Sequence, residues 1–320
     1  METMVLRRCR KTLILFLAFA WFYVIVLIGD HYFVLSKLGL LRPPGSRSRL
    51  CMNSEGRLGN HLFKFASMFG IARSKGLVPL LQRDSLLVRV FELNGIIKVD
   101  NRLCESFVKH RDIRDSAYDS ASVDFSNATD IALQGYFQSW KYFKASENEL
   151  RRKLRIKSNL VANASEKLER SIKEQLGSVS LGEKTFVGIH VRRGDYLASK
   201  TVEYGYVVAT REYLQRATDF FRSRFNRVIF VVCSEDLGWC KKNVRGGDVV
   251  FIEGQSAELD FTTLTLCNHT IMTVGSFGWW SAWLTNGITL YYKHQFRQGS
   301  DLSKVYNLST YFPPEWIAME

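Results

Sequence analysis

The sequence predicts an α/β fold built on parallel sheets. After Leu181, apolar β-branched runs alternate with amphipathic stretches, as expected of strands joined by crossover helices. The run from Phe186 to Val191 is apolar along its whole length, which is typical of a parallel strand buried on both faces. Near residue 50, a second strand, a glycine-containing turn and a helix follow one another. Apolar residues make up 46% of the 320 residues, enough for a sizeable core.

The N-terminal segment predicts a membrane anchor. Leu13 to Ile28 contains no charged residue, four basic residues lie within residues 7–11, and Asp30 follows the run. At about 1.5 Å per residue the run is a short but usable span, and the basic residues before it place the N-terminus in the cytosol. We therefore expect a cytosolic tail over 1–11, a signal anchor over 12–29 and a stem over 30–49. Ala18-Phe-Ala20 leaves a cleaved signal peptide open as the alternative.

Sequons and cysteines support a lumenal position for the remainder of the chain. The predicted N-glycosylation sites are Asn127, Asn163, Asn268 and Asn307. The five cysteines after the anchor are Cys51, Cys104, Cys233, Cys240 and Cys267, and none has zinc-site spacing. In an oxidising compartment some should pair, and an odd number leaves at least one free or bridging to another chain. Because a short span suits the thinner membranes of the early secretory pathway, we expect a single-pass Golgi membrane protein.

The net charge of +13 does not indicate a nucleic-acid binder. Residues 1–50 hold eight Lys or Arg against two acidic residues, and the other basic residues are scattered. A nucleic-acid-binding protein would need a dense basic face with exposed aromatic residues. We expect no nucleic-acid partner, and the sequence leaves the oligomeric state open.

The first half of the expected folded part contains one informative stretch. Cys51-Met52 is predicted to end a strand, and residues 53–60 form a glycine-containing turn before a helix over His61–Lys75. Free backbone N–H groups at such a helix start can cradle a phosphate, although a tight turn with packing glycines is the alternative. Further strands are expected at Val78–Gln82 and Ile131–Phe137, and a helical stretch at Glu147–Glu174, broken near Ser158.

The second half has clearer periodicity. After the strand Phe186–Val191, the expected strands are Val228–Cys233, Val249–Ile252, Thr270–Val274 and Ile288–Tyr292. The expected helices are Thr210–Phe225 with Thr210 as N-cap, Leu237–Asn243, Ala257–Cys267 with Ser256 as N-cap, and one that starts at Trp279.

Polar segments follow the carboxyl ends of these strands and should meet at one edge of the sheet, where open α/β sheets bind ligands. The segments are Arg192–Asp195, Ser234–Asp236, Glu253–Gln255 and Gly275–Gly278. Guanidinium groups match phosphate oxygens bidentately, and Asp195 is placed to orient one of them. Phe277 could stack on a base. A surface ion pair is the alternative for Arg192-Arg-Gly-Asp195 alone, but the convergence of segments predicts a nucleoside diphosphate site.

Several motifs resemble those of a known enzyme family. His190-Val-Arg-Arg-Gly-Asp195 resembles the H-x-R-R-x-D signature shared by α1,2-, α1,6- and protein O-fucosyltransferases, and Gly56-Arg-Leu-Gly-Asn60 resembles the G-R-x-G-N element of that superfamily. The run from Asp260 to Trp280 and Phe312-Pro-Pro-Glu-Trp316 are similar to the α1,2-fucosyltransferases in particular. The similarity extends from about residue 50 to the end. His61 departs from it, because the family usually has Gln there.

The resemblance implies a GT-B fold of two Rossmann-like halves facing a cleft, with an acceptor half over 50–180 and a donor-binding half over 181–320. It further implies GDP-β-L-fucose as the donor, no cofactor, no metal, and inversion at the anomeric carbon. The acceptor would be a glycan with a terminal β-galactose, attacked through its 2-hydroxyl. The sequence agrees on one point, since it contains no Asp-x-Asp, the motif by which many other sugar-nucleotide transferases hold a divalent metal.

By the same resemblance, the catalytic set is Arg192, Asp195 and Asn60. Arg192 would meet the charge on departing GDP. The implied donor-binding residues are Arg57, Gly59, Asn60, His190, Arg192, Arg193, Asp260, Ser276 and Phe277. The general base stays open between Glu55, His61, Asp195 and Glu253. A fucosyltransferase of another linkage (α1,6 or protein O-linked) and a non-catalytic glycan-binding relative are the alternative functions.

Overall fold

A computed structural model describes residues 23, 47–53, 55–127, 129–177 and 183–320. The predicted anchor Leu13–Ile28 falls, apart from residue 23, outside the described residues. Within the described ranges no helix is both long and apolar enough to span a bilayer. Residues Ser48–Glu320 form one compact unit that contains two parallel sheets.

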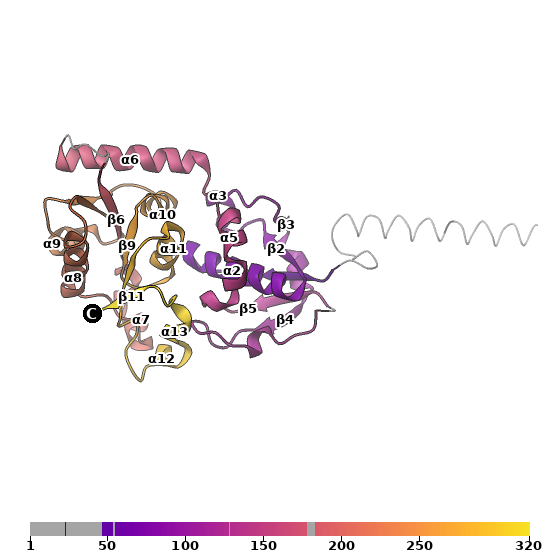
Figure 1. The fold of residues 1–320 in the computed structure, drawn as a ribbon. Helices are drawn as coiled ribbons and strands as arrows, with labels where there is room; N and C mark the ends of the chain where they lie inside the picture. Colours follow the sequence, from indigo (N-terminus) through magenta and orange to yellow (C-terminus); the bar gives the residue numbers. More distant parts are fainter. Residues whose placement is uncertain (1–22, 24–46, 54, 128, 178–182) are drawn as a thin grey trace, which may run out of the picture. The chain divides into compact units, whose positions relative to one another are not determined.

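The first sheet has five parallel strands in the order β3-β2-β1-β5-β4 (Figure 1). Its strands are β1 (Arg49–Met52), β2 (Val78–Gln82), β3 (Ile97–Val99), β4 (Val108–Arg111) and β5 (Ile131–Gln134). The central position of β1 places the turn that follows it at the middle of the carboxyl edge. The predicted strand Ile131–Phe137 is three residues shorter, because Gly135 takes a positive φ of 114° and ends the ladder.

Helix α2 (Leu58–Lys75) follows β1 and is the central helix of the first half. Fourteen of its 18 residues are buried, so it is covered on nearly all sides rather than along one stripe. It begins three residues before the predicted start, directly after Arg57 in extended conformation, and ends at Gly76 in the left-handed conformation. The other helices before the second sheet are α3 (Leu87–Val90), α4 (Asn101–Glu105), α5 (Glu147–Lys153) and α6 (Ser158–Leu176).

The second sheet has six parallel strands in the order β11-β10-β9-β6-β7-β8. Its strands are β6 (Thr185–Val191), β7 (Val228–Ser234), β8 (Val249–Phe251), β9 (His269–Met272), β10 (Thr289–Tyr292) and β11 (Ile317–Met319). Strand β6 is central and buried over Val187–Val191, as its apolar run predicts. The expectation of an α/β fold with parallel sheets is confirmed.

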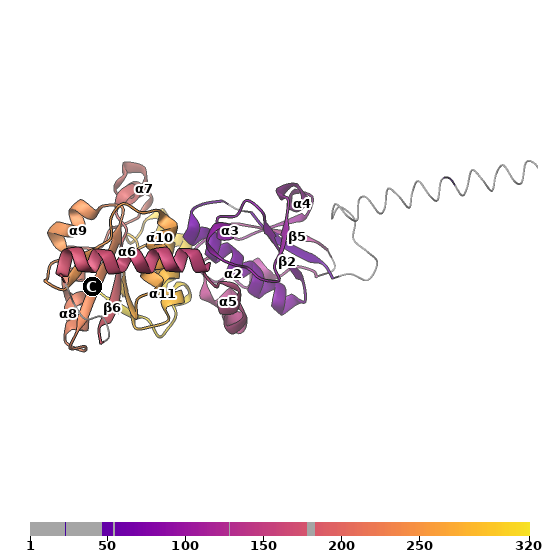
Figure 2. The ribbon, with the colours of Figure 1, turned by 90° about the horizontal axis from the view of Figure 1, so that it is seen from above.

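The helices of the second half are α7 (Ser199–Tyr204), α8 (Arg211–Arg222), α9 (Leu237–Asn243), α10 (Ala257–Thr265), α11 (Ser276–Thr285), α12 (Asp301–Val305) and α13 (Leu308–Tyr311). Thr210 and Ser256 cap α8 and α10 as predicted, each accepting a backbone N–H three residues ahead. Helix α11 begins three residues earlier than predicted, directly after Gly275. Figure 2 shows α6 running alongside α10, with which it is in contact.

A shared aromatic core joins the two sheets. Helix α11 packs against α2, and the ring of Phe63 lies 4.5 Å from Trp279 and 5.2 Å from Trp280 between centroids. Tyr311 and Phe312 belong to the same buried cluster as α2. The predicted boundary at 180/181 separates the sheets, yet the core crosses it. This packing fixes the starts of α2 and α11 close together.

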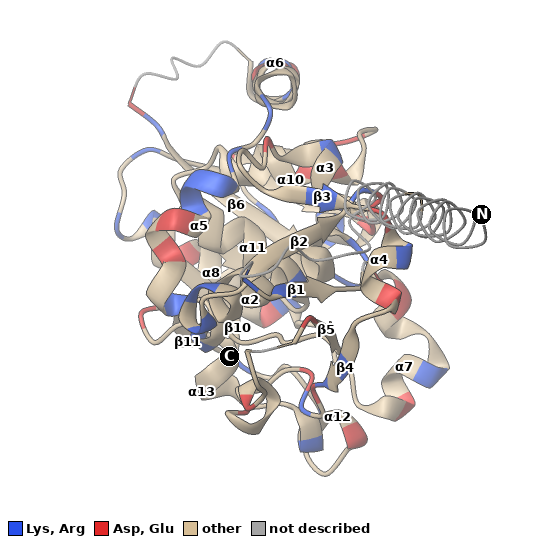
Figure 3. Ribbon diagram, turned by 90° about the vertical axis from the view of Figure 1, so that its right-hand side faces the viewer, with Lys and Arg blue, Asp and Glu red and all other residues tan. Residues whose placement is uncertain are grey.

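A disulfide between Cys51 and Cys104 links β1 to α4. Cys233, Cys240 and Cys267 are free and buried. Acidic and basic residues are mixed on helices such as α5, α7 and α12 (Figure 3).

Candidate active site

A cavity of about 460 Å³ opens at the carboxyl edges of both sheets, a size typical of small-ligand sites. Its lining comes from the starts of α2 and α11, the loops after β4, β5 and β6, helix α7 with the residues just after it, and residues 295–311. The lining residues are Gly56, Arg57, Gly59, Asn60, Asp115, Ser116, Tyr136, Gln138, Arg192, Asp195, Tyr196, Thr201, Tyr204, Tyr206, Val274, Gly275, Ser276, Phe277, Gln295, Leu302, Val305, Tyr306 and Tyr311.

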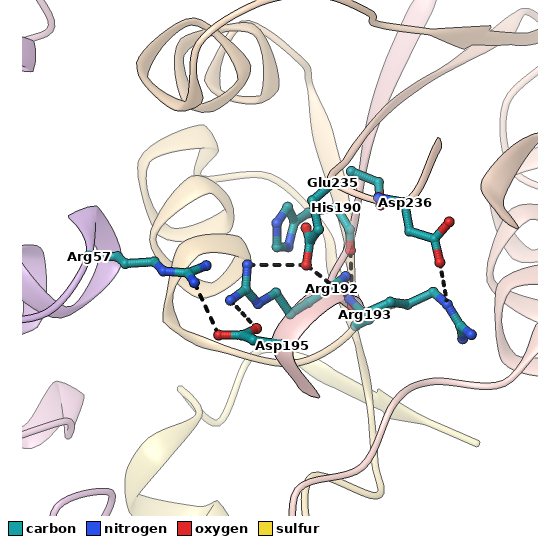
Figure 4. Close-up of polar contacts among 9 residues, drawn as sticks. Arg57, His190, Arg192, Arg193, Asp195, Glu235 and Asp236 are labelled. Atoms are coloured by element: carbon teal, nitrogen blue, oxygen red, sulfur yellow. Dashed lines mark hydrogen bonds and ion pairs between the residues drawn. The ribbon is translucent and has the colours of Figure 1, made fainter. Parts of the chain in front are cut away.

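Arg192 is held rigidly at this cavity. Its guanidinium forms ion pairs with Asp195 and, at 3.1 Å, with Glu235, and its backbone N–H donates to Thr273 at 2.9 Å (Figure 4). The side chain is only 16% exposed and lies 5.3 Å from the ring centroid of Tyr196. A guanidinium preorganised in this way can receive an anion without first paying the entropic cost of ordering.

Asp195 connects the two halves of the molecule across the cavity. Its carboxylate accepts from Arg192 and also from Arg57, at 3.2 Å, which extends from the start of α2 (Figure 4). Arg57 is 70% exposed, so it is free to reorient toward a ligand. The resemblance to fucosyltransferases implies that Arg57, Arg192 and Asp195 belong to one site, and in the structure ion pairs link the three residues.

The N-termini of α2 and α11 meet at the same place. Neither helix has a side-chain cap, so backbone N–H groups and the positive ends of both helix dipoles face the cavity. Gly59 makes the approach possible: a Cβ there would lie 2.6 Å from the backbone nitrogen of Phe277 and 2.7 Å from the hydroxyl of Ser276. We call Arg57, Arg192, Asp195, Ser276 and these helix starts the arginine side of the cavity.

Asn60 ties the arginine side together. Its side-chain oxygen accepts from the Ser276 hydroxyl at 2.8 Å and from the Gln138 amide at 3.0 Å. Because the oxygen is engaged twice, the amide nitrogen is the group that Asn60 can offer to a ligand. The predicted residues Arg57, Gly59, Asn60, Arg192, Asp195, Ser276 and Phe277 thus all line one cavity.

His190 lies behind Phe277 on the arginine side and does not itself line the cavity. It is 4% exposed, its ring centroid lies 4.8 Å from that of Phe277, and its Nδ1 is buried without a hydrogen-bond partner. Burial, with a smaller contribution from the charge of Arg192, lowers the pKa of His190 to about 3. The imidazole is therefore neutral, and it supports Phe277 through packing.

Arg193 points away from Arg192. Its guanidinium donates to Asp236 at 3.1 Å (Figure 4). It also lies 4.1 Å from the ring centroid of Trp239. Successive residues leaving a strand point in opposite directions, so two adjacent arginines cannot both face the cavity. The predicted donor contact of Arg193 is not part of the cavity lining.

Asp260 also lies outside the cavity lining. Its carboxylate accepts from Gln255 at 2.7 Å and from the thiol of Cys233. Burial raises the pKa of Asp260 to about 6, although these hydrogen bonds act in the opposite direction. The donor-binding role predicted for Asp260 would require a ligand to reach beyond the cavity toward the start of α10.

The candidates for general base occupy different environments. His61 is buried and hydrogen-bonded to Ser85 at 3.0 Å. Glu253 is exposed and paired with Lys241, and Glu55 lies 4.0 Å from Lys64. Asp195 lies in the cavity but bridges two arginines. The first three are absent from the cavity lining.

All four predicted glycosylation asparagines are exposed. Asn163 lies on the surface of α6. The side-chain oxygens of Asn268 and Asn307 accept backbone N–H groups, at 2.8 Å from Phe186 and 3.0 Å from Ser309. Glycosylation at these positions stays a prediction.

The comparisons with known proteins agree with this architecture. The family model Glycosyl transferase family 11 matches residues 4–320. The chain is 34% identical over 281 residues to galactoside α-(1,2)-fucosyltransferase 2 of Hylobates lar, covering 85% of this chain and 80% of the relative. This chain belongs to glycosyl transferase family 11.

Further matches are consistent with that assignment. Galactoside α-(1,2)-fucosyltransferase 1 of Rattus norvegicus is 33% identical over 274 residues, covering 82% of this chain and 71% of the relative. A variant of Arabidopsis thaliana FUT1 in complex with GDP is similar in structure, with a TM-score of 0.54 and 12% identity over 85% of this chain and 76% of that chain. At that identity the likeness concerns the fold alone.

The cavity of this family 11 enzyme has a further group of lining residues that the sequence analysis did not predict. Asp115 and Tyr136 follow β4 and β5, and Tyr204 and Tyr206 lie at the end of α7. We call these four residues the tyrosine side of the cavity. Polar or aromatic residues directly after a strand end could have indicated this side of the cavity. The sequence of β4, Val-Lys-His-Arg, is mostly polar, however, and so does not predict a strand before Asp115.

Proposed function

We propose that this glycosyltransferase transfers L-fucose from GDP-β-L-fucose to the 2-hydroxyl of a terminal β-galactose, with inversion and without a metal. The names of the curated relatives and the GDP complex of the Arabidopsis protein support the choice of substrates. The observation that carries the proposal is the meeting of two uncapped helix starts with Arg192 at one cavity.

The arginine side suits the leaving group of this reaction. As the galactose oxygen forms its bond to the fucose anomeric carbon, the bond from that carbon to the diphosphate breaks and GDP takes the electron pair. Arg192 and the N–H groups of the two helices are the fixed donors proposed to meet that negative charge, and the exposed Arg57 would turn toward it. Asn60 and Ser276 add polar contacts beside them.

Protein cations support the metal-independent form of the proposal. In other transferases a metal ion would stabilise the negative charge on the departing diphosphate. In this proposal the guanidinium groups of Arg57 and Arg192 take that role. Activity should therefore persist in EDTA, and a requirement for added manganese or magnesium would contradict this part of the proposal.

An acceptor panel tests the function itself. The purified full-length chain is incubated with GDP-fucose and glycans ending in β-galactose, in 2-deoxygalactose or in other sugars, and the product linkage is determined by permethylation analysis. We expect an α1,2 linkage on galactose and no product from the 2-deoxy acceptor. Transfer to another hydroxyl would reassign the linkage, and an absence of transfer to every acceptor would favour a non-catalytic relative.

We also propose that residues 12–29 anchor the enzyme in the Golgi membrane with the catalytic part in the lumen. The uncharged run after a basic cluster supports this topology. In intact vesicles the chain should resist added protease and carry glycans removable by peptide-N-glycosidase. A soluble product that begins near Trp21 would identify the segment as a cleaved signal peptide instead.

A further inference from the structure

The tyrosine side is built by loops at the carboxyl edge of the first sheet. Asp115 lies four residues after β4 ends at Arg111, and Tyr136 lies two residues after β5 ends at Gln134. These two strands are neighbours in the sheet, so both loops emerge at the same place. The carboxylate of Asp115 accepts a hydrogen bond from the backbone N–H of Tyr136.

The backbone of these loops is held in an uncommon conformation. Gly135 and Phe137 have positive φ values, 114° and 49°, and a positive φ at a non-glycine residue persists only where its surroundings enforce it. The Phe137 backbone N–H donates to Asp112 at 3.0 Å, its carbonyl accepts from Ser67 at 2.8 Å, and its ring is fully buried. The kink directs Tyr136 and Gln138 to the cavity while Phe137 anchors in the core.

Aromatic rings connect the tyrosine side to the arginine side. Ring centroids of Tyr196 and Tyr206 lie 4.6 Å apart, those of Tyr204 and Tyr206 lie 5.9 Å apart, and Tyr196 also contacts the Arg192 guanidinium. Burial raises the pKa of Tyr206 to about 12, so its hydroxyl stays neutral. Neutral phenol rings pack on the apolar faces of sugars, and their hydroxyls can hydrogen-bond sugar hydroxyls.

Asp115 differs from the other acidic residues near the cavity because no cation is paired with it. Within the described ranges it takes part in no salt bridge, whereas Asp195 bridges Arg57 and Arg192. Burial raises the pKa of Asp115 above its usual range, while more distant charges on Arg111 and Lys64 act in the opposite direction. Asp115 and the arginine side line the same cavity, and the charges of both Asp115 and Asp195 act on the hydroxyl of Tyr206.

Lys64 supports this arrangement from α2. It is 3% exposed, donates to Asn53 at 2.8 Å, and its Nζ lies 5.0 Å from the ring centroid of Tyr136. Its ammonium therefore stabilises the ring of Tyr136 rather than pairing directly with Asp115. A carboxylate without a direct cationic partner keeps its basicity, which a general base needs.

We propose that Asp115 is the general base of the transfer reaction and that the tyrosine side is the subsite for the acceptor sugar. This inference rests on the proposed function. Asp115 would take the proton of the attacking galactose hydroxyl, whose oxygen bonds to the anomeric carbon as GDP departs with the electron pair. The proton is released from Asp115 to water after the product leaves, so that the step is balanced without any further reactant.

The substitution Asp115→Asn tests the assignment, because it keeps the size and polarity of the side chain but removes its basicity. We expect kcat to fall by about 10²–10⁴-fold, the usual range for a general base, with the affinity for GDP unchanged in calorimetric titration. Asp124→Asn is the matched control, since Asp124 is an exposed aspartate of the same connecting segment and does not line the cavity. It should retain wild-type kcat. An Asp115→Asn variant within about threefold of wild type overturns the proposal.

The pH profile separates a base from a merely structural residue. The groups facing Asp115 are Arg111 and Asp112 on its own segment, Lys64 on α2, Tyr136 after β5, Tyr204 as the last residue of α7, and Tyr206 just beyond it. Wild-type kcat/KM should fall at acidic pH as a single carboxyl group is protonated, and this acidic limb should disappear in Asp115→Asn. An unchanged limb in the variant overturns the proposal.

A second variant keeps the test decisive if Asp115→Asn is poorly folded. Asp115→Glu retains a carboxylate, so it should recover part of kcat and keep an acidic limb. Loss of all activity in a folded Asp115→Glu, or a wild-type profile without an acidic limb, overturns the proposal. If wild type itself transfers fucose to no acceptor, the proposed function fails first, and this failure is distinguishable because it does not depend on any substitution.

Discussion

The two sides of the cavity handle charge in opposite ways. On the arginine side, Arg57, Arg192 and Asp195 are linked by ion pairs, and two helix starts add fixed partial charges. On the tyrosine side, burial keeps the tyrosines neutral, and Asp115 has no direct cationic partner among the residues that the structure describes. A group that must stay ionised is stabilised by fixed opposite charge, and a group that must exchange a proton is kept away from such charge. In the proposed mechanism, this contrast separates leaving-group stabilisation from acceptor binding.

The largest expected effect is that of Arg192→Ala. Removing a preorganised donor to a developing negative charge costs about 3–4 kcal/mol, which is roughly 10²–10³ in rate. Arg192→Lys should recover little, because an ammonium cannot reproduce the bidentate contact. Steady-state kcat and calorimetric GDP affinity measure the loss.

Arg193→Ala is the matched control for that substitution. Its guanidinium is similarly buried but contacts Asp236 and Trp239, so the variant should lose thermal stability and keep its GDP affinity within about threefold. Equal losses of GDP affinity in both variants would mean that the two arginines act together on the donor, contrary to the direction in which Arg193 points.

Gly59→Ala tests whether the close approach of the two helices matters. The added Cβ meets backbone atoms 2.6 Å away in α11, and overpacking of this kind costs about 1–3 kcal/mol. We expect GDP to bind about tenfold more weakly, as measured by calorimetry. Gly70→Ala makes a similar clash with the Tyr142 carbonyl, far along α2 from the cavity. It should lower the thermal midpoint without affecting GDP affinity, and a comparable loss of affinity there would point to general disruption of α2.

His190 should make folding stability sensitive to acid. Its pKa is about 3 in the folded state against a usual value of 6.5, so below pH 6.5 the unfolded chain binds more protons and the free energy of unfolding falls. Between pH 7 and pH 5 wild type should lose about 2 kcal/mol more than His190→Gln in urea titrations. Asp260, whose raised pKa acts with the opposite sign, is present in both proteins and cancels. Parallel pH profiles for the two proteins would show that the imidazole is hydrated.

The smallest expected effect is on the tyrosine side. Tyr204 is 39% exposed and lines the cavity, so Tyr204→Ala should raise the acceptor KM about fivefold, equivalent to about 1 kcal/mol, with GDP affinity unchanged. Leu197→Ala removes an exposed apolar side chain from the same segment outside the cavity lining and should leave both constants unaltered. A weakened GDP affinity in Tyr204→Ala would remove the distinction between the two sides.

Much of the second half could be predicted from the sequence. The apolar run of β6, the caps Thr210 and Ser256, and the exact bounds of α9 all follow from local patterns of a few residues. Such signals are carried by neighbouring residues in the chain, so they can be read without a structure. That the motifs around Arg57 and Arg192 both belong to the donor site was implied only by the resemblance to fucosyltransferases.

The tertiary structure alone decided how these motifs face each other. It turned Arg192 toward the cavity and Arg193 away, and it brought Asn60 within 2.8 Å of Ser276, 216 positions along the chain. It also placed Asp115 beside Tyr136, because β4 pairs with β5. The mostly polar sequence of β4 does not predict that pairing. The physical reason is that side-chain direction and long-range contact depend on how sheets and helices pack, and no local pattern of residues encodes that packing by itself.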